Sequence, residues 1–81
     1  MLIDIYPCNG KFTDIEKQLK KITEEHREVR NAYHCGDMVN MAEELADLAT
    51  CCVTLLAGIG ADIPAVFKMV ALKNKRRHYY G

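Results

Sequence analysis

Four acidic residues in two spaced pairs are the part of this sequence best suited to chemistry. Glu25 and Glu28 lie three residues apart, and so do Glu44 and Asp47. Residues three apart lie on one face of a helix, so each pair of carboxylates can point at a common spot. Converging carboxylates repel one another unless a cation lies between them, and such oxygen ligands suit Mg²⁺ or Mn²⁺. The same spacing is also typical of acidic residues on a solvated helix face.

Helix phase separates these four residues from the neighbouring Glu24 and Glu43. At about 100° per residue, Glu25 and Glu28 fall on one side of the apolar seam of their helix. Glu24 falls close to the opposite face and is expected to point into solvent. Glu44 and Asp47 likewise share one side of the next helix. The phase therefore favours two pairs that each act as a unit.

The two pairs also lie at matching distances from a turn that we predict at Gly36. Glu28 lies eight residues before Gly36 and Glu44 lies eight residues after it, while Glu25 and Asp47 each lie eleven residues away. A short connection makes consecutive helices antiparallel, so equal distances place the two pairs at the same height. We therefore predict a single site built from four carboxylates.

Three helices are expected to position these residues. The first begins with a capping box that opens at Thr13, and it stops near Gly36. The second begins after Asp37 as its N-cap and runs to about Gly58, and the third begins after Asp62. The apolar seam of the first helix recurs at intervals of four and three residues, typical of a bundle. Its members are Ile15, Leu19, Ile22, His26, Val29 and Tyr33.

The chain is short for the amount of apolar surface it carries. It has 81 residues, and residues 48–60 contain no charged side chain. A helix that is apolar on most sides needs more cover than three helices provide, and small cores are often completed by oligomerisation. The predicted fold is all-α, an antiparallel helical hairpin plus a third helix, with a four-helix-type bundle completed by oligomerisation. Residues 1–11 form an N-terminal arm, and residues 12–81 form the helical domain.

Composition argues against several classes of function. The formal net charge is zero, which gives no general attraction to nucleic acid polymers or membranes. The N-terminus has no basic start followed by an apolar run, and no stretch approaches the ~20 apolar residues of a membrane span. The four cysteines include no C-x-x-C pair and no spacing typical of a zinc site. We expect a cytoplasmic protein with no nucleic acid and no membrane as partner.

Three segments together resemble a known family. They are "EEHRE" at residues 24–28, "EELAD" at residues 43–47 and "KNKRRHYY" at residues 73–80. In this order the segments resemble the MazG-like all-α nucleoside triphosphate pyrophosphohydrolases, and the resemblance spans residues 12–80. The first two segments are fairly specific. The basic segment is weak alone, because cations at the end of a helix also complement the helix dipole.

The resemblance implies cleavage of a (d)NTP between its α- and β-phosphates, which yields a nucleoside monophosphate and pyrophosphate. It implies that one set of carboxylates binds Mg²⁺, or Mn²⁺, and carries the catalysis: Glu25, Glu28, Glu44 and Asp47. It implies that the substrate is contacted by the end of the third helix: Lys73, Asn74 and Arg77. Glu24 matches the first glutamate of the motif. Because its helix phase turns it outward, we expect it at most to support the metal ligands and not to bind the metal itself.

The resemblance also implies a homodimer or homotetramer, in agreement with the uncharged second helix. Two other functions stay open at this point. One is a phosphoribosyl-ATP pyrophosphatase-like enzyme, which shares the helical arrangement of carboxylates. The other is a non-catalytic helical module for oligomerisation or regulation, whose carboxylates form a solvated face.

Overall fold

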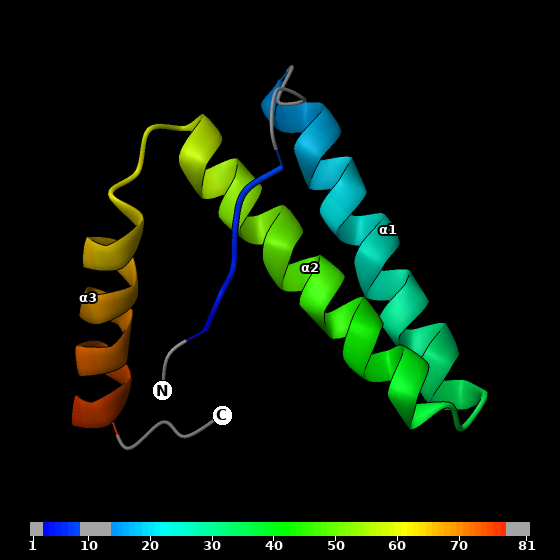
Figure 1. Ribbon diagram of the computed structural model, residues 1–81. Coiled ribbons are helices and arrows are strands. Elements are labelled where there is room, and N and C mark those ends of the chain that lie inside the picture. Colours follow the sequence, from blue (N-terminus) through cyan, green and yellow to red (C-terminus); the bar gives the residue numbers. More distant parts are fainter. Residues whose placement is uncertain (1–2, 9–13, 78–81) are drawn as a thin grey trace.

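The computed structural model describes residues 3–8 and 14–77, and these ranges contain three helices and no strand (Figure 1). Helix α1 spans Ile15–His34, α2 spans Met38–Gly58 and α3 spans Ile63–Arg76. Helices α1 and α2 lie side by side and run antiparallel, whereas α3 turns away at the far end of α2. The expected all-α fold, a helical hairpin plus a third helix, is confirmed.

An aspartate caps the start of each helix. Asp37 and Asp62 are the predicted N-caps of α2 and α3, and their Oδ1 atoms accept from the backbone N–H three residues later, at 3.0 and 3.2 Å. At α1 the N-cap is Asp14, whose Oδ1 accepts from the backbone N–H of Lys17 at 2.7 Å. The predicted cap position was one residue too early, and Thr13 itself lies outside the described residues. Each cap satisfies a backbone donor that the helix leaves unpaired.

The hairpin turns at Gly36, as the sequence predicted. Its φ angle is +72°, which lies in the left-handed region that only glycine enters at little cost. The backbone N–H of Asp37 then donates to Ala32 O at 3.1 Å, which closes the end of α1. This short turn makes α1 and α2 antiparallel neighbours and brings residues at equal distances from the turn to the same height.

The core of the described residues lies mainly between α1 and α2. Gln18 Nε2 on α1 donates to Cys51 O on α2 at 2.9 Å, which links the two helices directly. The buried residues of the two helices are Glu25, Val29, Ala32, Cys51, Val53 and Thr54. Burial of a carboxylate in such a small core is unusual, because an ionised group pays a large desolvation cost.

The predicted seam of α1 is only partly buried. Val29 is buried, but Ile15, Leu19, His26 and Tyr33 are all exposed. Helix α2 packs on the side of α1 that carries the acidic residues, so the rest of the apolar stripe faces outward.

The described part of the N-terminal arm, residues 3–8, lies next to α2 (Figure 1). The backbone N–H of Cys8 donates to Thr54 Oγ1 at 3.0 Å, and the same hydroxyl donates to Thr50 O at 2.8 Å. Thr54 is only 4% exposed. The arm therefore covers a polar position on α2 and uses its hydroxyl as an anchor.

Replacing Thr54 with valine should lower the free energy of unfolding by about 1 kcal/mol, because the N–H of Cys8 loses its acceptor. Chemical denaturation with urea measures the change. The matched control is Thr50→Val, since the hydroxyl of Thr50 donates to Ala46 O within its own helix and makes no hydrogen bond to the described part of the arm. Equal effects of the two substitutions would show that the arm contact contributes no stability.

Helix α3 is poorly covered. It contacts α2 but not α1, none of its residues is buried, and its large apolar side chains Phe67, Met69 and Leu72 are more than half exposed. Among the described residues, no single helix is long and apolar enough to span a membrane, although α2 and α3 pass that test together as a pair bent by 117°. Much of the apolar surface of α3 therefore stays exposed in the described chain.

Candidate metal centre

Three of the four predicted carboxylates come together between α1 and α2. Glu25 and Glu28 on α1 and Glu44 on α2 each place one oxygen within 4.8 Å of the others. This convergence follows from the helix phase and from the equal distances of Glu28 and Glu44 from Gly36. Carboxylate oxygens at such separations repel one another strongly when all are ionised.

Burial makes this group different from an acidic patch on the surface. Glu25 is 8% exposed, and its Oε2 atom is fully covered without a hydrogen-bond partner. Glu44 Oε2 is covered and unpartnered in the same way. A buried carboxylate oxygen without a partner costs free energy that a solvated one does not. These two oxygens, Glu25 Oε2 and Glu44 Oε2, are suitable ligands for a hard divalent cation, because such a cation binds oxygen and offsets the negative charge of the carboxylates.

A lysine holds the other oxygen of the buried glutamate. Lys21 lies one turn before Glu25 on α1, and its Nζ atom is 3.6 Å from Glu25 Oε1. The charge of Glu25 raises the pKa of Lys21. Since Oε1 is paired with the lysine, Oε2 is the oxygen left for a ligand. Lys21 therefore orients the carboxylate and compensates part of its charge.

The crowding of carboxylates also changes the acidity of the group. The pKa of Glu44 is raised to about 7, first because its protonated form can hydrogen-bond to Glu28, and then because of burial and the charges of Glu28, Glu25 and Asp47. Without a cation, Glu44 therefore takes up a proton at a higher pH than an ordinary glutamate does. Binding of a metal must displace that proton.

We predict that the metal-free protein loses stability between about pH 4.5, the ordinary pKa of a glutamate, and about pH 7, the raised pKa of Glu44. In this interval the folded protein binds more protons than the unfolded chain, so raising the pH favours unfolding. Mg²⁺ or Mn²⁺ should raise the melting temperature more at about pH 8 than at about pH 6, where the proton competes. Thermal unfolding followed by circular dichroism measures both effects.

The control for this prediction is Glu44→Gln, which removes the titrating group and should flatten the pH dependence of the melting temperature. The prediction would be contradicted if the melting temperature of the wild type fell with pH no more steeply than that of Glu44→Gln. The comparison isolates Glu44, because both proteins keep Glu25 and Glu28.

Comparison with known protein families bears directly on this geometry. The family model of the MazG nucleotide pyrophosphohydrolase domain matches residues 13–81. The chain belongs to the MazG family. No curated protein and no solved structure matches the chain. The matched range includes all three helices and the converging carboxylates.

Asp47, the fourth predicted carboxylate of this MazG domain, lies outside the converging group. It is exposed on α2, one turn after Glu44, and its charge contributes to the raised pKa of Glu44. Its role as a ligand remains a prediction. Glu24 is exposed, in line with its helix phase.

The predicted substrate contacts lie far along the chain from the MazG carboxylates. Lys73 and Asn74 lie in the last turn of α3, and Arg77 is its C-cap. Because α3 does not contact α1, the described residues of one chain do not bring this basic end to Glu25 and Glu28 (Figure 1). These three contacts stay predictions.

Two features near the carboxylates were missed by sequence reasoning. Lys21 had a detectable signal, because it lies four residues before Glu25, a spacing that pairs charges on a helix. The second feature is a cavity next to Glu28 and Glu44 that takes residues from both helices. No local pattern marks it, since its lining residues meet only when the hairpin folds.

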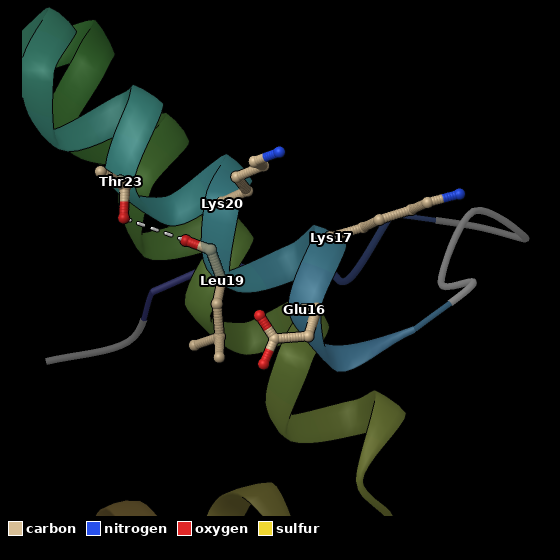
Figure 2. Close-up of a pocket in the computed structure, with 5 residues that line it drawn as sticks. All are labelled: Glu16, Lys17, Leu19, Lys20 and Thr23. Carbon is tan, nitrogen blue, oxygen red and sulfur yellow. Dashed lines mark hydrogen bonds between the residues drawn. The ribbon is translucent and has the colours of Figure 1, made fainter.

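A different cavity, at the start of α1, offers no comparable chemistry. Figure 2 shows its lining, in which the ammonium groups of Lys17 and Lys20 extend away from the helix. The hydroxyl of Thr23 is already used, because it donates to Leu19 O at 3.2 Å. The cavity, of about 340 Å³, contains none of the converging carboxylates. It belongs to the exposed face of the hairpin.

Proposed function

We propose that this MazG domain is a Mg²⁺-dependent nucleoside triphosphate pyrophosphohydrolase that converts a (d)NTP and water to a (d)NMP and pyrophosphate. Family membership supports nucleotide pyrophosphohydrolase chemistry in general. The observation that carries the metal dependence is the pair of covered, unpartnered oxygens on Glu25 and Glu44. Covered carboxylate oxygens without a hydrogen-bond partner have a chemical reason to bind a divalent cation.

In this proposal Glu25, Glu28 and Glu44 hold the cation, and Asp47 joins them when substrate binds. A bound Mg²⁺ or Mn²⁺ supplies positive charge to the phosphates and lowers the pKa of bound water. Lys21 keeps Glu25 in place through Oε1. Hydrolysis of the anhydride also requires a group that accepts the proton of the attacking water, and the carboxylates of the set are the candidates.

We further propose that the active protein is a homodimer or homotetramer. The outward side of the α1 seam, with Leu19 and Tyr33, and the exposed Leu45 of α2 provide an apolar face for a second hairpin. Packing two hairpins on each other would complete a four-helix bundle. The apolar surface of α3 supplies a further contact, and a neighbouring subunit is the proposed route by which Lys73, Asn74 and Arg77 reach a substrate.

The test is a pyrophosphate-release assay of the full chain with Mg²⁺ against each common ribo- and deoxyribonucleoside triphosphate and phosphoribosyl-ATP. We expect release of pyrophosphate, rather than phosphate, from at least one nucleoside triphosphate, and none without a divalent cation. Preference for phosphoribosyl-ATP would identify the related pyrophosphatase instead. No release from any substrate, combined with no effect of millimolar metal on the melting temperature, would favour a non-catalytic helical module.

A further inference from the structure

A cavity of about 280 Å³ that is open to solvent, with most of its lining residues exposed, lies beside the carboxylates, toward the turn of the hairpin. It shares Glu28 and Glu44 with the metal-binding group, so a ligand that occupies the cavity lies directly next to the cation. Asn31 from α1 and Asn40 from α2 line it from opposite helices. The cavity is therefore a space into which a substrate held by the carboxylates can extend.

The charge of the lining decides which part of a nucleotide fits. Among the described residues, no lysine, arginine or histidine lines the cavity, whereas Glu28, Asp37 and Glu44 do. Phosphate groups need cationic partners, and here they would meet carboxylates at close range. A triphosphate can therefore approach only as far as the metal, and the uncharged sugar and base are the parts suited to the cavity.

The two asparagines supply the polar groups that an uncharged ligand needs. Asn31 lies one turn after Glu28, and Asn40 lies one turn before Glu44. The hydrogen bonds of the described residues engage neither side-chain amide. Each amide offers both donors and an acceptor, a set that matches sugar hydroxyls and the edge of a base. Asp37 is partly satisfied already, because its Oδ1 caps α2.

Size agrees with this assignment. Pockets that enclose whole drug-sized ligands measure roughly 300–1,000 Å³, so a space of about 280 Å³ suits part of a nucleotide better than all of it. The part left outside is the triphosphate, which extends past the metal-binding group.

We propose that this cavity receives the nucleoside end of the substrate, with Asn31 and Asn40 hydrogen-bonding to its sugar or base and thereby setting nucleotide preference. The proposal rests on the pyrophosphohydrolase function proposed above. It gives the substrate a direction along the hairpin, with the nucleoside toward Gly36 and the phosphates toward the metal.

The test compares a nucleotide with a polyphosphate that has no nucleoside. In Asn31→Ala and Asn40→Ala, we expect KM for the best nucleotide to rise about tenfold or more, with kcat within about threefold of wild type, since ground-state contacts are lost. The inhibition constant of Mg²⁺–tripolyphosphate should stay unchanged. A matched control is Lys20→Ala, whose ammonium group extends away from α1 (Figure 2) and which should alter neither value.

A conservative variant separates recognition from a structural effect. Asn40→Leu keeps roughly the size of the side chain and adds no charge but removes its donors and its acceptor, so the order of preference among nucleotides should change while the melting temperature with saturating Mg²⁺ stays close to wild type. If KM and the inhibition constant of Mg²⁺–tripolyphosphate rose together in these variants, phosphate would lie in the cavity and the proposal would be overturned. Alanine variants that leave KM unchanged would also overturn it.

The cavity can also be tested if the wild-type protein hydrolyses no nucleotide, an outcome that would defeat the proposed function. Nucleoside monophosphates with Mg²⁺ would then be titrated into ¹⁵N-labelled protein. Shifts of the side-chain amide signals of Asn31 and Asn40 would support binding of the nucleoside there. Saturating ligand without such shifts would overturn the inference.

Discussion

Replacing Glu25 with glutamine should lower pyrophosphate release about 1,000-fold or more, a loss that corresponds to roughly 4 kcal/mol of transition-state stabilisation. The substitution keeps the shape of the side chain but removes the charge of a ligand whose Oε2 is covered and unpartnered. Binding of Mn²⁺, measured by titration calorimetry, should weaken in parallel. Glu28→Gln should act in the same direction, because Glu28 belongs to the same converging group.

Stability gives this prediction a second readout. Without metal, Glu28→Gln should melt at a higher temperature than the wild type, because one of the repelling charges is gone. The stabilisation by added metal should shrink. Glu43→Gln is the matched control, since Glu43 is an exposed glutamate on α2 beside Glu44 and should behave as wild type. Full activity in both Glu25→Gln and Glu28→Gln would disprove the proposed metal centre.

Asp47→Asn tests the fourth carboxylate separately. If Asp47 joins the ligand set only with substrate, its loss should reduce kcat but leave the affinity for Mn²⁺ in the absence of substrate nearly unchanged. Weakening of metal binding to the same extent as in Glu28→Gln would instead make Asp47 a permanent ligand.

Introducing a glutamate at Leu45 should dissociate the assembly. Leu45 is 46% exposed in the single chain and lies on the apolar face proposed to contact a second hairpin. An unpaired charge at a buried contact costs several kcal/mol, so the dissociation constant should rise by about 100-fold or more. Sedimentation velocity over a range of protein concentrations measures the change, and activity should fall with the oligomer.

Val39→Glu provides the control for this substitution. Val39 is 74% exposed on the same helix, and at about 100° per residue it lies about 120° round from Leu45. The same chemical change should therefore leave the assembly intact. A wild-type protein that sediments as a monomer at all concentrations would reject the proposed oligomer.

Much of the hairpin was predictable because its determinants are local. Asp37 caps α2 and Gly36 takes a positive φ angle, and both were expected from residue type and position alone. The convergence of Glu25, Glu28 and Glu44 was also within reach, since helix phase and distance from the turn are properties of the sequence.

What could not be predicted depends on contacts between distant segments. The seam of α1 includes Tyr33 and Val29, yet only Val29 is buried, because the approach of α2 selects one side of the apolar stripe. Asn31 and Asn40 line one cavity only after the hairpin closes. Periodicity identifies an apolar stripe without saying which neighbour covers it.

The exposure of α3 has a consequence for how the proposed activity should depend on protein concentration. An isolated helix of this length is marginal in water, and α3 buries no residue in the single chain. In the proposed oligomer, α3 gains its cover from a neighbour, so its amide hydrogens should exchange quickly in dilute protein and slowly in concentrated protein. If α3 also delivers Lys73 and Arg77 to the substrate, turnover per chain should rise with protein concentration until assembly is complete.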